Sequence, residues 1–247
     1  MTRLFDVCRE AAGGLLHLIY PAVCAACTRP LVQSEQHFCT SCRAALTTDS
    51  LPSCPRCAST VGPFSVLEGG CNNCRAYAFH FKNVIRLGPY DGLLREMILR
   101  TKHVTGELLS ELLGSLWAEH AEGRLRALQA HVVMPVPLHW WRRWTRGYNQ
   151  SESLARALAA RLGLPCRGRW LRRVRNTPRQ VDQSAAARRE NVRNAFIAPV
   201  RLDLRGKTVL LVDDVLTTGS TASEAASALR KAGAGQVVVA VLAHSRS

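Results

Sequence analysis

The chain has 247 residues, 47% of them hydrophobic, which is enough for one α/β domain with its own core and a smaller module beside it. Its formal net charge of +15 favours polyanionic partners. No apolar run reaches the length of a membrane-spanning helix, and charged residues interrupt the apolar pattern near the start, which argues against a secretory signal peptide. We therefore expect a cytoplasmic protein without a membrane span.

The first segment of the chain has helical periodicity. Apolar residues recur at helical spacing from Leu4 to Ile19, with Asp6, Arg9 and Glu10 between them. This pattern predicts an amphipathic helix over residues 1–20.

Eight of the ten cysteines form Cys-x-x-Cys pairs within residues 24–74. Each pair can place two thiolates on one metal ion, and two pairs complete a tetrahedral Zn²⁺ site. Redox dithiols would explain one pair but not four so close together, and this cysteine density in a reducing compartment favours zinc over disulfides. We expect a double zinc-ribbon module over residues 21–80 that holds one or two structural Zn²⁺ ions through Cys24, Cys27, Cys39, Cys42, Cys54, Cys57, Cys71 and Cys74.

The spacing leaves the pairing of these ligands open. Sequential pairing joins the first four cysteines across a spacer of eleven residues and the last four across a spacer of thirteen. Interleaved pairing, as in RING-like sites, is also compatible with the spacing. Little apolar sequence lies between the pairs, so metal binding is expected to supply much of the module's folding free energy.

The pattern changes after the cysteine region and predicts an α/β domain over residues 81–247. Short apolar runs alternate with segments of helical periodicity, and Lys102 lies in a break between two of these helices. The predicted strands and helices of the first half are, in chain order, Val84–Leu87, Leu93–Arg100, Glu107–Leu128 and Val132–Pro137.

Positive charge is concentrated between His139 and Arg193, where the chain has fourteen arginines, no lysine and three acids. At the start of this segment tryptophans and arginines interleave, which suits base stacking and phosphate contacts along single-stranded DNA. The alternative is a helix start whose indole rings cover the edge of the sheet. Asn149 or Ser151 can cap the next predicted helix, Glu152–Leu162. The candidate DNA-contacting residues are Trp140, Trp141, Arg142, Arg143 and Trp144.

A polar, basic segment extends from Arg172 to Arg188. Its composition is that of a solvated loop. A loop of this kind that lies over a phosphate site can close on pyrophosphate, exclude water and add charged donors.

The most informative stretch lies near the carboxyl end. Val209–Val212 has the pattern of a buried parallel strand, and two acids, Asp213 and Asp214, come where that strand is expected to end. The hydroxyl and glycine residues of Thr217–Thr221 then lead into a predicted helix over Ala222–Lys231. In such a turn, backbone N–H groups, hydroxyls and the positive end of the helix dipole converge on one phosphate.

The paired acids narrow the choice of ligand. Carboxylates beside a phosphate site repel an anion unless they hold sugar hydroxyls or Mg²⁺, so the implied ligand is a sugar phosphate with free hydroxyls. An ordinary capped turn between strand and helix is the alternative, but it needs no double acid. No Gly-Lys-Ser/Thr follows the strand, which excludes a P-loop nucleoside triphosphatase.

This motif resembles the signature of type I phosphoribosyltransferases, which bind phosphoribosyl pyrophosphate (PRPP). It follows the cysteine pairs, a Pro-Val-Pro-Leu run at Pro135–Leu138 and an Arg-Gly-Tyr-Asn-Gln run at Arg146–Gln150. This order is similar to that of the ComF family, with coverage from about Cys24 to Ala243. The resemblance implies an α/β fold in which a parallel sheet is flanked by helices and preceded by a small zinc module.

The resemblance also implies roles for individual residues. Asp213 and Asp214 would face the ribose hydroxyls, and Mg²⁺ would accompany PRPP. The implied phosphate-binding residues are Thr217, Thr218, Gly219, Ser220 and Thr221. The residues implied on the pyrophosphate side or in the covering loop are Lys102, Arg146, Arg175, Thr177, Gln180 and Arg188.

Two functions follow from the resemblance and the charge. The first is a phosphoribosyltransferase that displaces pyrophosphate at ribose C1, with an acceptor that the sequence does not identify, acting in DNA uptake during natural competence. The second is a non-catalytic protein that binds single-stranded DNA through its basic Trp/Arg surface and docks on a competence helicase through the zinc module. A purely structural zinc scaffold leaves Asp213 and Asp214 unexplained.

Overall fold

A computed structural model of the chain describes residues 22–72, 74–175, 190–199 and 203–245, with the side chains of Trp141, Arg142 and Arg146 left out. The helix predicted over residues 1–20 lies outside these ranges, as do the loop residues Thr177, Gln180 and Arg188. Contacts divide the chain into two compact units, Met1–Leu46 and Thr47–Ser247. The second group of four cysteines therefore belongs to the same unit as the sheet. The module boundaries expected at residues 20 and 80 stay predictions.

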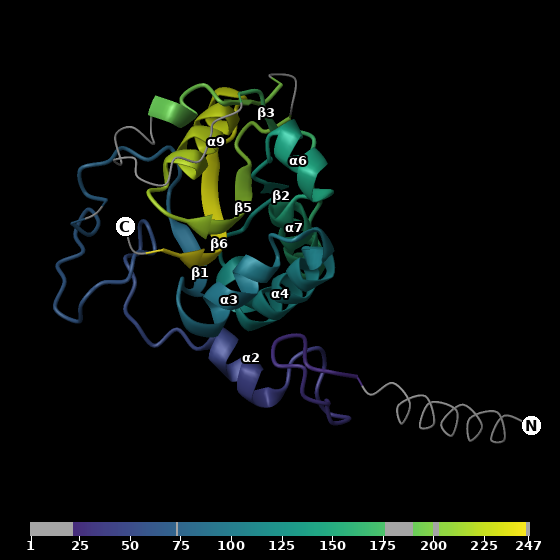
Figure 1. Cartoon of the computed structure of the whole chain (residues 1–247). Coiled ribbons are helices and arrows are strands. Elements are labelled where there is room, and N and C mark those ends of the chain that lie inside the picture. Colours follow the sequence, from purple (N-terminus) through teal and green to yellow (C-terminus); the bar gives the residue numbers. More distant parts are fainter. Residues whose placement is uncertain (1–21, 73, 176–189, 200–202, 246–247) are drawn as a thin grey trace, which may run out of the picture. The chain divides into compact units, whose positions relative to one another are not determined.

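The larger unit is built on a parallel four-stranded sheet with the strand order β1-β6-β5-β2 (Figure 1). β5 pairs with β6 from Thr208 opposite Gln236 to Leu216 opposite His244, so these two long strands end together at one edge of the sheet. The strands of this sheet are β1 (Val84–Pro89), β2 (Val132–Pro135), β5 (Thr208–Leu216) and β6 (Gln236–His244). A second, antiparallel sheet consists of β3 (Arg172–Arg173) and β4 (Phe196–Ile197).

Helices cover both faces of the parallel sheet. α9 (Ser220–Lys231) lies over β5 and β6, as Figure 1 shows. One buried cluster joins α9 to alternate strand residues such as Leu211 and Val239. The intervening Leu210 and Val238 are equally buried, and successive strand residues point to opposite faces, so the far face is covered too.

The helix α7 (Gln150–Leu162) packs on β2 and β5, and α4 (Glu107–His120) packs on α7. Among the described residues, no helix combines the length and the apolar character that crossing a membrane requires. The remaining described helices are α2 (Thr40–Thr47), α3 (Gly92–Arg100), the 3₁₀ helix η1 (Val104–Gly106), α5 (Glu122–Arg126) and α6 (Trp140–Arg146).

The predicted fold class is confirmed, with differences at the ends of elements. β5 runs to Leu216, past the predicted end at Val212, because its pairing with β6 continues, so the two acids lie inside the strand rather than after it. The helix predicted over residues 107–128 is interrupted at Ala121, whose φ of −103° and ψ of 11° are not helical. β6 has no counterpart among the predicted elements.

Candidate functional site

The loop between β5 and α9 has the geometry of an anion site. Gly219 occupies the N-cap of α9 with a left-handed φ of 74°. A Cβ at this position would come 3.1 Å from the Phe79 ring, so glycine alone fits without strain. Within the described ranges, no acceptor takes the backbone N–H groups of Thr217, Thr218 or Gly219. The hydroxyls of Thr218 and Ser220 lie 2.8 Å apart at the same point, so donors converge at the positive end of the helix.

Two carboxylates lie on β5 just before this loop. Asp213 Oδ1 accepts hydrogen bonds from Ser151 Oγ at 2.8 Å and from the Asp214 N–H at 2.9 Å. Burial, and after it the neighbouring Asp214 carboxylate, raise the pKa of Asp213 to about 7. Asp214 accepts from the Val215 N–H at 2.7 Å, and its Oδ2 lies 3.6 Å from Lys102 Nζ. The pair therefore joins a carboxyl that titrates near neutral pH to one that is paired with a lysine.

A buried polar segment at the start of α7 holds the turn that carries Lys102. The carbonyl of Thr101 accepts hydrogen bonds from the Tyr148 hydroxyl and from Gln150 Nε2, the latter at 3.0 Å. Gly106 lies against the same hydroxyl, where a Cβ would come within 2.6 Å. These contacts restrain the backbone next to Lys102, so its ammonium group is presented to the acids by a fixed turn.

The same segment reaches the end of β2 and the acids. Asn149 Nδ2 donates to the Val136 carbonyl at 3.1 Å, and Ser151 donates to Asp213. Asn149 occupies the N-cap of α7 as predicted, but its side chain makes no capping bond because the amide is turned to Val136. No role in the site was predicted for these residues. The sequence pattern that could have indicated such a role is an unbroken polar run, Tyr-Asn-Gln-Ser, which follows a glycine and leads into an amphipathic helix.

The residues expected on the pyrophosphate side are placed unequally. Lys102 lies at the acid pair. Arg175 is exposed and donates to the Arg193 carbonyl at 2.5 Å; among the described residues, no hydrogen bond or ion pair joins Arg175 to the acids. Arg146 is the last residue of α6, and only its backbone is described.

The helix α6 presents part of the Trp/Arg segment to solvent. Trp140 is 66% exposed and Trp144 is 75% exposed, so most of the surface of each residue faces solvent. The side chain of Arg143 is also exposed and lies 3.3 Å from a carboxylate oxygen of Glu152. Of the five residues predicted to contact DNA, the three with described side chains are thus accessible.

Four thiols gather at each of two points, and their pairing is sequential rather than interleaved. Cys27 Sγ lies 3.8 Å from Cys39 Sγ, and Cys54 Sγ lies 3.8 Å from Cys74 Sγ. A tetrahedron with Zn–S bonds of about 2.3 Å has edges of about 3.8 Å, so both clusters fit structural zinc. A hydrogen bond with Ser41 lowers the pKa of Cys39 to about 6, which favours the thiolate. The first cluster is Cys24, Cys27, Cys39 and Cys42, and the second is Cys54, Cys57, Cys71 and Cys74.

The two clusters begin with the same turn. The Cys24 N–H donates to the Arg29 carbonyl, and the Cys54 N–H donates to the Ser59 carbonyl, both at 2.8 Å. The residue after the first Cys-x-x-Cys pair of each cluster has a left-handed φ, 62° at Thr28 and 59° at Ala58. The module is therefore an internal repeat of one metal-binding turn, which the sequence reveals only in its cysteine spacing.

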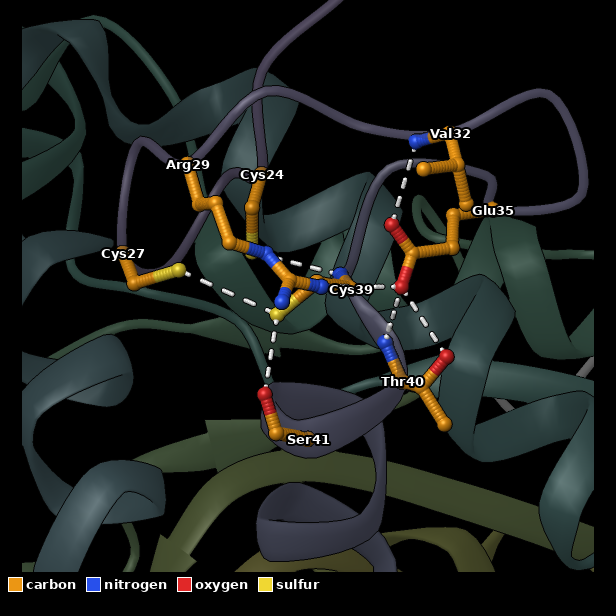
Figure 2. A network of polar contacts seen from close by, with 8 residues as sticks. All are labelled: Cys24, Cys27, Arg29, Val32, Glu35, Cys39, Thr40 and Ser41. Atoms are coloured by element: carbon orange, nitrogen blue, oxygen red, sulfur yellow. Dashed lines mark hydrogen bonds and ion pairs between the residues drawn. The ribbon is translucent and has the colours of Figure 1, made fainter.

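Glu35 connects the residues around the first cysteine cluster through hydrogen bonds and an ion pair (Figure 2). Its carboxylate accepts from the Thr40 N–H at 2.7 Å, the Thr40 hydroxyl at 2.9 Å and the Val32 N–H at 3.2 Å. Arg29 Nη2 lies 3.0 Å from the same carboxylate. The Thr40 N–H contributes most to lowering the pKa of Glu35. This network fixes the start of α2 against the first metal-binding turn.

The second cluster is anchored to the sheet by Arg86 of β1. The side chain of Arg86 is 2% exposed, and its guanidinium binds both oxygens of Asp49, at 2.9 and 3.0 Å. It also donates to the Ala58 carbonyl at 2.7 Å and to the Thr60 hydroxyl at 2.8 Å. The contacts with Ala58 and Thr60 thus reach the turn that begins the second cluster and the residue after it.

Two phenylalanines connect this cluster to the loop before α9. Phe79 packs against the four cysteines and stacks on Phe81, with ring centroids 4.5 Å apart. Both rings contact the position that a Cβ of Gly219 would take. The His80 N–H donates to Ser223 Oγ of α9 at 3.1 Å. The second cysteine cluster and the loop between β5 and α9 are therefore parts of one packed assembly.

Two family models match the chain. The model of the phosphoribosyl transferase domain matches residues 149–247, and the model of the double zinc ribbon domain matches residues 15–78. The first range contains the acid pair and the β5–α9 loop, and the second contains both cysteine clusters.

Proteins of known sequence match most of the chain. Competence protein F of Haemophilus influenzae is 31% identical over 226 residues, which are 90% of this chain and 96% of that protein. DNA utilization protein YhgH of Escherichia coli K12 is 31% identical over 225 residues, again 90% of this chain and 96% of that protein. A ribose-phosphate pyrophosphokinase of Pyrococcus furiosus is 50% identical over 44 residues, 18% of this chain and 16% of that protein. With a double zinc ribbon, a phosphoribosyl transferase domain and relatives aligned over nearly their whole length, the chain belongs to the ComF family of competence protein F.

Proposed function

We propose that the chain binds PRPP or a related sugar phosphate, together with Mg²⁺, at the loop between β5 and α9. The observation that carries this proposal is a set of three backbone N–H groups at the start of α9 that have no acceptor in the described part of the chain, next to two carboxylates. Such N–H groups suit a phosphate, and carboxylates suit sugar hydroxyls. The names of the relatives, competence protein F and DNA utilization protein, support a role in DNA uptake.

In this proposal each part of the site has one task. Thr217–Thr221 bind the 5′-phosphate, and Asp213 and Asp214 hold the ribose hydroxyls. Carboxylate oxygens are suitable ligands for Mg²⁺. When the ion is bound together with PRPP, it neutralises the charge of the pyrophosphate. The residues assigned to pyrophosphate are Lys102, Arg146, Arg175, Thr177, Gln180 and Arg188.

Transfer would make one bond and break another at the same carbon. An acceptor forms a bond to ribose C1 while the bond from C1 to the pyrophosphate oxygen breaks. The phosphate loop and the acids hold the sugar in position, and the cations stabilise the charge that develops on pyrophosphate. The acceptor is the component that the family resemblance does not identify.

Replacing both acids, as Asp213→Asn with Asp214→Asn, is expected to weaken PRPP binding in Mg²⁺ by a factor on the order of 10² to 10⁴. Each hydrogen bond to an ionised group contributes about 1.5–3 kcal/mol, and two are lost. Isothermal titration of the zinc-loaded full chain measures the effect. Asp203→Asn is the matched control, because the Asp203 side chain is 80% exposed and pairs only with Lys207 among the described residues. A double variant that binds PRPP as well as wild type contradicts the proposal.

The same titration at several pH values reports on Asp213. Its pKa is raised to about 7, so the carboxyl is protonated at pH 6 and ionised at pH 8. PRPP affinity should therefore rise with pH over this interval and should rise less in the double variant. Release of pyrophosphate in the presence of a panel of nucleobases then separates a transferase from a protein that only binds the ligand.

A second candidate function is binding of single-stranded DNA by α6. The exposure of Trp140 and Trp144 next to an exposed Arg143 favours it, because buried rings would be unable to stack on bases. The concentration of arginine from His139 to Arg193 would add phosphate contacts. In this case the zinc module would serve as the docking surface for a DNA-translocating helicase.

Replacing Trp140 and Trp144 by alanine is expected to weaken binding of an oligothymidylate by about 1–3 kcal/mol for each base that loses its stacking partner. Wild-type affinity should also fall steeply between 50 and 200 mM salt, because arginine contacts release counterions. Fluorescence anisotropy of a labelled strand measures both. Phenylalanine at the same two positions keeps an aromatic face and should retain most of the affinity. Salt-independent binding that the alanine variants leave unchanged counts against this function.

A further inference from the structure

A cavity lies between the second cysteine cluster and the loop before α9. Its volume is about 240 Å³. One wall is the end of β5 with Thr217 and Thr218, the first residues of the proposed phosphate site. The opposite wall comes from the second cluster and the residues after it, with Tyr77 and Phe79 as its largest side chains. The cavity therefore adjoins the proposed 5′-phosphate position at the edge where β5 and β6 end.

The aromatic wall of this cavity is held in place. The rings of Tyr77 and Phe79 have centroids 6.2 Å apart and are inclined at 45°. Phe79 also contacts the stacked ring of Phe81 and the side chain of Arg56, whose guanidinium carbon lies 5.3 Å from the centroid of the Phe79 ring. Supported aromatic side chains favour a planar ring as the occupant, through stacked or edge-on contacts.

The polar groups of the cavity suit a neutral ring with hydrogen-bonding atoms. His244, the last residue of β6, lines the cavity and is 5% exposed, and its Nδ1 has no hydrogen-bond partner among the described residues. Buried nitrogen atoms without a partner are rare in folded proteins, so this one is available for a hydrogen bond with an atom in the cavity. Burial lowers the pKa of His244 to about 4, so the imidazole is neutral at physiological pH and offers a donor or acceptor rather than a charge. The amide of Asn72 adds a second such group at the exposed rim.

We infer that this cavity holds the heteroaromatic ring of a nucleotide whose 5′-phosphate occupies the Thr217–Thr221 loop. This inference rests on the proposed function and names the chemical class of the acceptor, which the family resemblance does not identify. A cavity of about 240 Å³ is smaller than the sites that enclose whole drug-sized ligands, so it suits one ring system and not an entire nucleotide. The phosphate then lies outside the cavity, on the loop that forms one of its walls, and the ribose lies at Asp213 and Asp214.

The test compares ribose 5-phosphate with adenosine and uridine 5′-monophosphates on the zinc-loaded full chain, by isothermal titration. At least one nucleotide should bind wild type about tenfold or more tightly than ribose 5-phosphate. Tyr77→Ala removes a stacking face from a half-buried position, and Ala76→Trp fills the cavity from an exposed position. In both variants the nucleotide should bind no better than ribose 5-phosphate, whose own affinity should stay at the wild-type value.

The possible outcomes separate the two proposals. If ribose 5-phosphate fails to bind wild type, the phosphate site itself is wrong. If it binds but no nucleotide binds more tightly, the phosphate site stands and the ring site is overturned. A nucleotide preference that survives both Tyr77→Ala and Ala76→Trp overturns the ring site as well, because the ring must then lie elsewhere. Far-ultraviolet circular dichroism and zinc content show that each variant is folded.

Discussion

Cys57→Ser is expected to remove zinc from the second cluster and to abolish binding of ribose 5-phosphate to the full chain. Cys57 is buried, and the module around it has little apolar sequence of its own, so metal binding carries its folding free energy. The loss of structure should extend from the second cluster to the loop before α9, because Phe79 contacts both the cysteines and the loop at Gly219. We expect the free energy of unfolding to fall by more than about 4 kcal/mol, the range typical of losing a structural metal. Urea denaturation, zinc content and phosphate titration measure the three effects.

Cys27→Ser provides the matched control. Cys27 belongs to the first cluster and to the other compact unit, and it is the exposed member of its set. This variant should lose zinc from the first cluster while ribose 5-phosphate binds with unchanged affinity. If Cys57→Ser retains phosphate binding, the link through Phe79 is wrong. If both variants lose phosphate binding equally, the two clusters do not act separately.

Arg86→Met is expected to lower the free energy of unfolding by about 3 kcal/mol. Removing one partner of a buried ion pair commonly costs about 3–5 kcal/mol, and the lower end applies here because the Asp49 side chain is 18% exposed and keeps some water. The substitution also leaves the Ala58 carbonyl and the Thr60 hydroxyl without their donor. Methionine retains most of the volume of the side chain, so the effect measures lost polar contacts rather than a cavity. Urea denaturation of the zinc-loaded chain gives the number.

The control for this prediction is the same substitution at an exposed pair. Arg126 lies 2.9 Å from Glu122, with its side chain 55% exposed. Arg126→Met should change stability by no more than about 1 kcal/mol, because exposed ion pairs contribute little. Equal effects at the two arginines would show that Arg86 does not anchor the second cluster to the sheet.

Features with a local chemical cause could be predicted from the sequence. Cysteines three residues apart can share a metal whatever the rest of the chain does, and the eight predicted ligands form two sets of four. A run such as Val209–Val212 followed by Thr217–Thr221 predicts a strand, a turn and a helix from neighbouring residues alone, and β5 and α9 confirm that order. Gly219 takes the left-handed conformation that the turn requires.

Features that depend on a distant partner could not be predicted. The predicted strand is shorter than β5 because the last residues of β5 are held by β6, which was not among the predicted strands. Asn149 was a candidate cap, but its amide reaches the Val136 carbonyl thirteen residues earlier. The spacing allowed both sequential and interleaved cysteine pairs, and only the folded turns distinguish them.

The division between these two kinds of feature has one physical reason. Metal-ligand spacing, turn chemistry and apolar periodicity act between neighbours, so the two cysteine sets, the turn between β5 and α9 and the α/β class could be predicted from the order of residues. The contact of Ser151 with Asp213, the pairing of Lys102 with Asp214 and the packing of Phe79 on Gly219 join residues far apart in the chain. Such contacts exist only once the sheet has formed, and folding alone decides which of the many polar and aromatic side chains meet.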